Sequence, residues 1–246
     1  MKQLKTDMHI HTAEDPVDRI SYSARQLIRD ASRLGYEVLA ITNHRAMTYD
    51  NELREYARKY GILLIPGVEA SIEKKHVLLY NMAYSPNSIR TFADLRRLKT
   101  EDSLVIAPHP FFPMPASLQR KLGENLDLFD GIEYCHFYFS WLNFNHRGVQ
   151  LARQKVLPLI GTSDAHMWWQ FHTTYSLVSG EKSVAGVIQA IKQGRVEVVS
   201  SPLSLRIVGK IGLMLPYQLM LELMAYSGIL GKRWADRRAS RAERPR

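Results

Sequence analysis

The sequence predicts an α/β protein in which short strands and amphipathic helices alternate along the chain. Apolar runs of strand length, such as residues 38–42 and 104–107, are separated by segments whose apolar residues have helical spacing. The two types of element alternate about seven times before residue 200. Such alternation indicates a parallel sheet with crossover helices, either closed into a barrel or open and doubly wound. The length of 246 residues suits one large α/β domain.

The first predicted strand, residues 4–8, leads directly into His9-Ile10-His11. A helix is expected over residues 21–35, where Gly35 provides a C-terminal stop. No glycine-rich phosphate loop follows the first strand, which counts against a dinucleotide-binding sheet. The remaining predicted strands are 38–42, 62–65, 76–82, 104–107, 131–134, 156–160 and 196–199. The remaining predicted helices are 49–60, 88–99, 115–122, a helix containing Trp141, Val149 and Leu151, and 183–192.

Composition is that of a soluble globular protein, with 46% hydrophobic and 23% charged residues. The single cysteine, Cys135, excludes an internal disulfide and fits a reducing compartment. Residues 1–7 contain no long apolar run, so no secretory signal is visible. We therefore expect a cytoplasmic location.

The C-terminal segment differs from the rest of the chain. Residues 232–246 contain seven Lys and Arg residues and two acidic residues, so they carry +5 of the net charge of +9. Residues 203–230 are apolar but interrupted by Pro216 and Glu222, which argues against a simple membrane span. We expect a hydrolase barrel at 1–200 and an apolar helix with a basic tail at 201–246. The helix either packs on the barrel or makes peripheral membrane contact through 203–246, and no protein partner is evident.

Histidines and acids recur where the predicted strands end. Side chains at i and i+2 of a strand share a face, so His9 and His11 leave the first strand together. The carboxyl ends of parallel barrel strands meet on one face, and imidazoles and carboxylates there are natural metal ligands. We therefore predict a metal site built from His9, His11, Asp15, His44, Glu69, His76, His109, Asp164 and His166. Of the other histidines, which we expect in the surface or core, His136 lies close to a strand end.

Five short motifs, in their order and spacing, resemble the PHP (polymerase and histidinol phosphatase) superfamily over roughly residues 4–200. They are Asp7-Met8-His9-Ile10-His11-Thr12, Ala40-Ile41-Thr42-Asn43-His44, Gly67-Val68-Glu69, His109-Pro110 and Ser163-Asp164-Ala165-His166. The resemblance implies a distorted seven-stranded (β/α)7 TIM-like barrel, here followed by a C-terminal helical extension. It also implies a site for three metal ions.

The resemblance further implies how the ligands divide. His9, His11, Glu69 and Asp164 would hold one metal, Glu69, His76 and His109 a second, and an acid with His44 and His166 the third. Two positions depart from the family pattern. Asn43 stands where the family has Asp, and Pro16 stands where it has the acid of the first motif. We choose Asp15 as that acid, with Asp18 as the alternative.

Such a ligand set predicts the hydrolysis of a phosphate ester. It suits two or three divalent ions, zinc, manganese or iron, which supply metal-activated hydroxide and neutralise phosphate oxygens. Arg45 either contacts substrate phosphate or is an ordinary surface arginine. The leaving group would be protonated by His166, by His109 or by a metal-bound water. The predicted catalytic residues are His9, His11, Glu69, Asp164 and His166.

The predicted substrate is a phosphorylated small molecule (a phosphomonoester), a nucleotide or a short oligonucleotide. Aromatic residues on or near the predicted strand-end loops either stack on a base or sugar or pack at the barrel mouth. They are Phe111, Phe112, Trp141, Trp168, Trp169 and Phe171.

Two other functions compete with the phosphoesterase. An amidohydrolase-type barrel also opens with His-x-His, but it places a metal-bridging lysine at a later strand end, and none stands in an obvious place here. A non-catalytic, metal-bearing scaffold would bind a partner through the basic tail. The near-complete ligand set argues against the loss of catalysis that this scaffold requires.

Overall fold

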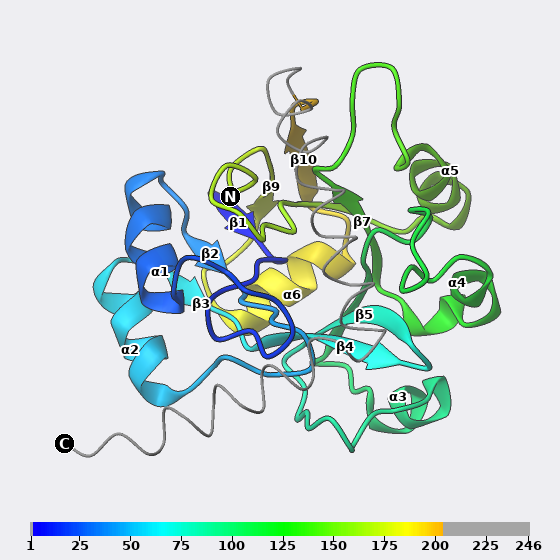
Figure 1. Ribbon diagram of the computed structural model, residues 1–246, viewed down its shortest axis with the longest axis horizontal. Coiled ribbons are helices and arrows are strands. Elements are labelled where there is room, and N and C mark those ends of the chain that lie inside the picture. Colours follow the sequence, from blue (N-terminus) through cyan, green and yellow to red (C-terminus); the bar gives the residue numbers. More distant parts are fainter. Residues whose placement is uncertain (1, 204–246) are drawn as a thin grey trace, which may run out of the picture. The chain divides into compact units, whose positions relative to one another are not determined.

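The computed structural model describes residues 2–203, which contain six α-helices and two five-stranded sheets (Figure 1). One compact unit spans Met1–Pro202. The mixed α/β class is therefore confirmed. A continuous seven-stranded barrel is not found within residues 2–203. The predicted C-terminal helix, basic tail and membrane contact lie outside the described residues and stay predictions.

The first sheet has the order β10-β9-β1-β2-β3. Its three N-terminal strands run parallel, with Thr6 opposite Val38 and Leu39 opposite Leu64. Strand β9 lies antiparallel to both β1 and β10. The strands are β1 (Gln3–Asp7), β2 (Val38–Leu39), β3 (Leu63–Leu64), β9 (Thr174–Ser179) and β10 (Val196–Ser200).

The second sheet has the order β4-β5-β6-β7-β8. Strands β4 and β5 form a hairpin whose turn residues, Glu73 and Lys74, have φ angles of 48° and 65°. Positive φ at both turn residues matches the right-handed twist of hairpin strands. Strands β6, β7 and β8 are parallel. The strands are β4 (Gly67–Ile72), β5 (Lys75–Tyr80), β6 (Leu104–Ala107), β7 (Gly131–Cys135) and β8 (Leu159–Thr162).

The sequence patterns missed β4 and β9, and the expected all-parallel arrangement is wrong for the strands that pair with them. Strand β5 pairs antiparallel with β4 and β6, and β10 pairs antiparallel with β9. The physical reason is that β4 and β5 join through a tight turn, so no crossover helix separates them. Strand β9 follows β8 without a helix, through the turn and loop at residues 163–173.

The two sheets meet where the strand-end motifs lie. One isolated parallel bridge joins Ile10 to Ala165, just beyond β1 and β8. A second joins His44 to Glu69, between the end of the β2 segment and β4. These single bridges hold the first and second sheets together at the predicted site, in place of the continuous ladder of a closed barrel.

The helices predicted at 21–35, 49–60 and 183–192 are confirmed within three residues at each end, whereas those predicted at 88–99 and 115–122 begin four and five residues later, at Phe92 and Arg120. Helix α1 (Ala24–Arg33) starts with a reciprocal capping box between Ser23 and Gln26, and it buries Leu27 and Ile28 as its spacing predicts. Trp141 lies outside α5, contrary to the prediction, because that helix starts only after Asn145. The other helices are α2 (Asn51–Lys59), α3 (Phe92–Leu98), α4 (Arg120–Glu124), α5 (His146–Lys155) and α6 (Val184–Lys192), with a short 3₁₀ helix at Leu126–Leu128.

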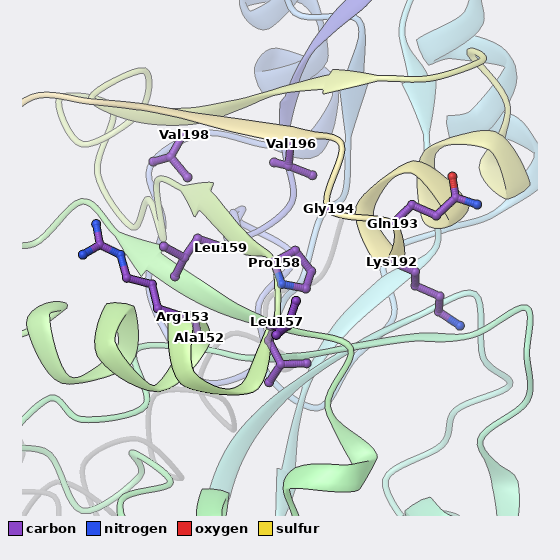
Figure 2. Close-up of a pocket in the computed structure, with 11 residues that line it drawn as sticks. Ala152, Arg153, Leu157, Pro158, Leu159, Lys192, Gln193, Gly194, Val196 and Val198 are labelled. Carbon is purple, nitrogen blue, oxygen red and sulfur yellow. The ribbon is translucent and has the colours of Figure 1, made fainter.

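A groove of about 700 Å³ lies at the ends of α5 and α6, where β8 and β10 begin (Figure 2). The predicted ligands follow the carboxyl ends of strands such as β1, β6 and β8, so the groove contains none of them. None of the helices in residues 2–203 has the length and apolar character needed to cross a bilayer. The cytoplasmic location stays a prediction.

Candidate metal centre

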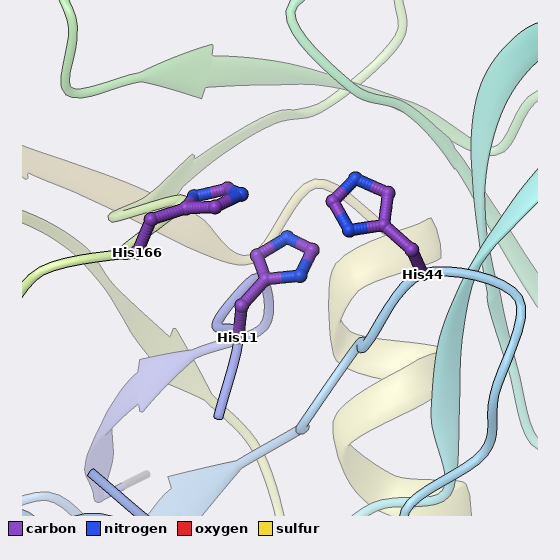
Figure 3. Close-up of side chains that lie close together, drawn as sticks. All are labelled: His11, His44 and His166. Carbon is purple, nitrogen blue, oxygen red and sulfur yellow. The ribbon is translucent and has the colours of Figure 1, made fainter. Parts of the chain in front are cut away.

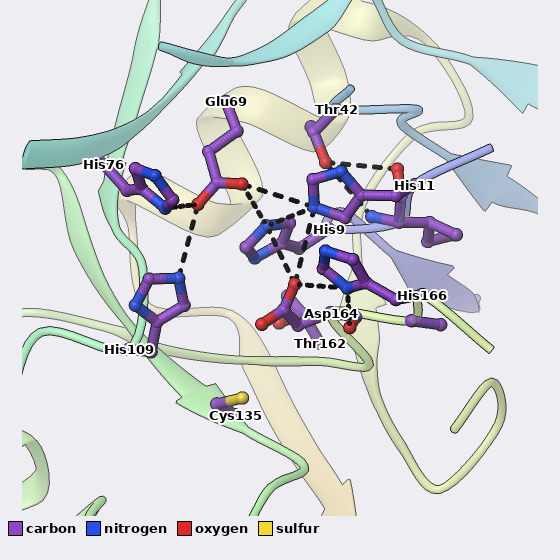
Figure 4. Close-up of polar contacts among 12 residues, drawn as sticks. His9, His11, Thr42, Glu69, His76, His109, Cys135, Thr162, Asp164 and His166 are labelled. Carbon is purple, nitrogen blue, oxygen red and sulfur yellow. Dashed lines mark hydrogen bonds and ion pairs between the residues drawn. The ribbon is translucent and has the colours of Figure 1, made fainter. Parts of the chain in front are cut away.

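Glu69 lies at the centre of the site, on β4. Its Oε2 atom is 3.4 Å from His9 Nε2, 3.3 Å from His11 Nε2 and 3.0 Å from His44 Nε2. Its Oε1 atom is 2.7 Å from His76 Nδ1 and 3.3 Å from His109 Nε2 (Figure 4). One buried carboxylate therefore faces five imidazoles, three on one oxygen and two on the other.

Asp164 forms the next part of the cluster. Its Oδ1 atom lies 3.3 Å from His9 Nε2, 3.5 Å from His11 Nε2 and 3.6 Å from His166 Nδ1. The loop after β8 presents this carboxylate with a left-handed backbone, φ 45°, and His109 after β6 has φ 27°. Non-glycine residues rarely adopt such angles, and they do so mainly at functional sites.

His11, His44 and His166 point toward one another from three separate segments (Figure 3). The ring of His11 stacks against both others, with centroids 4.4 Å from His44 and 4.1 Å from His166, and those two centroids lie 5.8 Å apart. Asp15 Oδ2 lies 2.8 Å from His11 Nδ1 and 3.0 Å from His44 Nδ1. Asp18 Oδ2 lies 3.4 Å from His44 Nδ1 and 3.3 Å from His166 Nε2. The choice between the two acids as third-metal ligand stays open, because each contacts two of these histidines.

The structure explains the two departures from the family pattern. Asp15 accepts hydrogen bonds from the backbone N–H groups of Val17 and Asp18, so its carboxylate shapes the loop around Pro16. Asn43 is fully buried and accepts a 2.8 Å hydrogen bond from the backbone N–H of Thr12. Its amide also donates to the hydroxyls of Thr12 and Thr48. Asn43 therefore ties the first two motifs together.

Glu133 is a residue of the site that sequence reasoning missed. It lies on β7, fully buried, and its Oε1 atom is 2.7 Å from His9 Nδ1. The hydroxyl of Thr162 and the backbone N–H of His109 also donate to this carboxylate. An acidic residue at the centre of a predicted buried strand was the available signal, since an unpaired charge is costly there.

The electrostatics of the cluster keep its carboxylates charged. Burial by itself raises the pKa of Glu69, but the imidazoles of His76 and His9 outweigh it and hold the pKa well below its usual range. Burial lowers the pKa of His11, but hydrogen bonds led by that to Asp15 raise it to about 10. The pKa of His44 rises to about 9 for the same reasons. A bound cation would take the place of the protons that these imidazoles otherwise carry.

These residues fit divalent metal ions. Three of the described groups whose ligand atoms lie within 4.8 Å of one another are His9–His11–Asp164, His11–His44–His166 and His44–Glu69–His76. Asp164 Oδ1 and His76 Nδ1 are buried and make no hydrogen bond, although both face oppositely charged groups. Buried polar atoms of this kind call for a partner, and a shared cation supplies one.

The structure brings all nine predicted ligands into one cluster, while their roles as ligands stay predictions. Arg45 lies beside the cluster with φ 55°, and its backbone N–H donates to the carbonyl of Glu69 at 2.8 Å. Its side chain is exposed, so contact with substrate stays a prediction. His136 is 1% exposed, and its Nε2 atom has no hydrogen-bond partner. Burial lowers the pKa of His136 to about 4, so its imidazole is neutral at physiological pH.

Comparisons with known proteins agree with these motifs. No protein-family model matches the chain. The uncharacterized protein MJ1587 of Methanocaldococcus jannaschii is 26% identical over 179 residues, which cover 68% of this chain and 99% of that protein. The PolC-type DNA polymerase III of Halalkalibacterium halodurans is 36% identical over 83 residues. These cover 33% of this chain but only 6% of the polymerase.

The similarity to PolC-type polymerases supports the assignment of this chain to the PHP superfamily. The fold of this chain is shared with the crystal structure of PsfC from Pseudomonas syringae PB-5123, with a TM-score of 0.60 and 18% identity. That similarity covers 90% of this chain and 100% of PsfC. At this identity it establishes a common fold and leaves the activity to be argued from the site.

Proposed function

We propose that this PHP protein is a metal-dependent hydrolase that acts on phosphate esters. One observation carries the proposal: the buried Glu69 carboxylate presents each of its oxygens to a different set of imidazoles. A carboxylate in that position is suited to bridge two cations. The similarity to PolC-type polymerases supports the assignment.

The cluster offers donors for two or three ions. The first would be held by His9, His11, Glu69 and Asp164, and the second by Glu69, His76 and His109. The third would be held by His44, His166 and either Asp15 or Asp18. Imidazole and carboxylate donors suit zinc, manganese or iron. Bound ions of this kind activate water near neutral pH and neutralise phosphate oxygens.

The chain's own residues position these donors. Glu133 faces His9 Nδ1, which leaves Nε2 directed at Glu69 and Asp164. Asp15 does the same for His11, whose Nε2 also faces Glu69. Carboxylates that accept from the far nitrogen of a ligand histidine fix its tautomer and ring orientation.

The exposed side of the cluster provides the residues that would handle substrate. The side chain of His166 is 30% exposed, whereas those of His9 and His11 are fully buried. We propose that Arg45 binds a phosphate oxygen and that His166 protonates the leaving group when only the first two ions are bound, since a third ion would occupy its imidazole. A general acid must reach the reacting atom, and of these three histidines only His166 is accessible.

The test combines metal analysis of the purified protein with a panel of phosphate esters. We expect two or three ions per chain and hydrolysis of at least one ester. Glu69→Gln keeps the shape of the side chain but removes its charge, so it should lower the metal content and reduce kcat/KM by about a hundredfold or more. His146→Ala, which changes an exposed histidine outside the cluster, is the matched control and should behave as the parent.

Two results would contradict the proposal. Hydrolysis of amides without hydrolysis of phosphate esters would favour the amidohydrolase-type activity. A protein that holds its metal ions but hydrolyses nothing across a broad panel would favour the non-catalytic scaffold.

A further inference from the structure

A row of aromatic rings leads away from the metal centre along the loops that follow β6 and β7. The ring of Phe112 lies 6.1 Å from His109 and 6.4 Å from Phe137. Phe137 lies 5.8 Å from Phe139, which stacks on Trp141 at 5.4 Å with an interplanar angle of 14°. The four residues Phe112, Phe137, Phe139 and Trp141, here called the aromatic row, begin in contact with a predicted ligand and end at the surface.

The outer end of the row is exposed to an unusual degree. Trp141 is 70% exposed, although one face of its indole is covered by Phe139. Tryptophan is normally well buried, and an exposed ring beside a site marks a surface that binds something. The loop that carries it extends away from the sheet between β7 and α5 (Figure 1). Asn145 anchors its base, since its side chain exchanges two 2.9 Å hydrogen bonds with the backbone of Cys135.

The charge around the aromatic row suits an anionic partner. Residues 108–123, 134–155 and 165–180, which include the loops after β6, β7 and β8, contain no Asp or Glu. Arg147 places its guanidinium over the ring of Phe111 at 4.5 Å, next to the row. Within the row only Trp141 is exposed, whereas Phe137 and Phe139 are half-buried and Phe112 is buried. Loops with an exposed indole and a basic group, and with no acid of their own, are complementary to phosphates joined to flat bases.

We propose that the aromatic row binds single-stranded nucleic acid and leads a phosphate of that strand into the metal centre. The position of the phosphate rests on the proposed phosphoesterase function, whereas binding to the row does not. Bases stack on aromatic side chains without regard to sequence, and a surface of this kind binds strands of mixed composition. The preferred substrate is therefore an oligonucleotide, since a strand with one phosphate in the metal centre can extend to the exposed Trp141 at the far end of the row.

The test measures binding separately from hydrolysis. The metal-loaded protein is titrated into a fluorescein-labelled, phosphorothioate-linked hexathymidylate, and fluorescence anisotropy is recorded. We expect Trp141→Ala to weaken binding about tenfold, the loss typical of one stacked base. Trp141→Phe keeps a flat ring and should restore most of the affinity. Tyr60→Ala removes a partly exposed ring at the end of α2 and serves as the control that leaves affinity unchanged.

Several outcomes decide the proposal. Equal affinity of Trp141→Ala and the parent overturns it. If Trp141→Ala loses binding to vesicles of phosphatidylcholine and phosphatidylserine but binds hexathymidylate as the parent does, the proposal is overturned in favour of a membrane-contact surface. If no phosphate ester is hydrolysed but Trp141→Ala still weakens hexathymidylate binding, the proposed function fails and the binding role of the row stands.

Discussion

Glu133 joins residues from three other strand ends through a single carboxylate. It contacts His9 after β1, His109 after β6 and Thr162 on β8. None of these contacts involves an exposed atom, because all four residues are buried. A carboxylate in this position acts on a metal through the histidine it holds, so its effect should be visible in metal affinity before it is visible in folding.

We predict that Glu133→Gln lowers metal affinity about tenfold to a hundredfold. The amide keeps the size of the side chain but no longer holds His9 by a charge-assisted hydrogen bond. Competition against a chelating indicator measures the affinity, and thermal unfolding of the metal-free protein monitors the fold. Glu197→Gln, at an exposed acid on β10, is the control. Unchanged affinity in Glu133→Gln would show that the carboxylate has no part in holding the metal.

Asp7 makes a different contribution, to the pH dependence of stability. Burial raises the pKa of this carboxyl to about 7, and hydrogen bonds from Ser163 and His9 oppose the rise only in part. Its Oδ1 atom accepts from the backbone N–H groups of both residues, while Oδ2 has no partner. In the unfolded chain the carboxyl ionises near pH 3.9. Stability is therefore lost as pH rises from about 4 to 7, because the unfolded state releases the proton first.

We predict that Asp7→Asn stabilises the metal-free protein above pH 7, by up to roughly 4 kcal/mol, and has little effect below pH 4. An amide keeps the two hydrogen bonds to Oδ1 and cannot ionise. Urea unfolding at several pH values in the presence of a chelator measures the difference. A difference that does not grow between pH 4 and 7 would disprove the assigned titration.

At the scale of elements, the close approach of β8 to the first sheet is decisive. Gly161 lies in β8, and its N–H and C=O both bond to the hydroxyl of Ser176 on β9. A Cβ at this position would lie 2.7 Å from the carbonyl oxygen of Tyr175 and 2.9 Å from Val198. The strand that leads to Asp164 thus depends on a residue without a side chain, because the backbone of the other sheet occupies that space.

Gly161→Ala should therefore destabilise the protein by about 1–3 kcal/mol, the usual effect of overpacking. Gly123→Ala, in α4, is the matched control, because a Cβ there meets nothing within 4 Å. It should leave stability unchanged or raise it slightly, as alanine favours the helix. Denaturant unfolding of both variants makes the comparison. Equal stability of the two variants would mean that the sheets can move apart at β8.

At the scale of the whole molecule, every predicted ligand and the entire aromatic row lie within the compact unit that ends at Pro202. The basic C-terminal segment supplies none of them. The two parts of the chain should therefore contribute separable properties, with the metal centre in the first and any contact with lipid in the second.

We predict that a chain ending at residue 203 retains the metal content and the phosphate ester hydrolysis of the full chain. Co-sedimentation with vesicles containing phosphatidylserine then tests whether the residues after 203 bind membranes. The full chain should sediment more strongly than the shortened one, because the basic segment attracts anionic lipid. If both forms stay in the supernatant, the predicted membrane contact should be abandoned.

Much of the site was predictable from sequence because its signals are local. His9 and His11 share a face through the period of the strand, and Asp164 and His166 repeat that spacing after a later one. The motif order then indicated the family. The hairpin of β4 and β5 escaped prediction because its turn contains neither Asn-Gly nor another strong signal, only Glu73 and Lys74.

By itself, the sequence determined that His9, His11, Asp164 and His166 stand just beyond strand ends, since strand spacing and motif order are properties of neighbouring residues. It misplaced Glu69, which lies inside β4 and not after a strand. Only the tertiary structure decided that Glu69 faces five imidazoles and that Glu133 supports His9. Those contacts join residues as far as 124 positions apart, and only the packing of one sheet against the other sets such distances. It also decided that the cluster is held by two sheets, which pack together at β8 and are joined by single bridges at the site, and not by one continuous barrel.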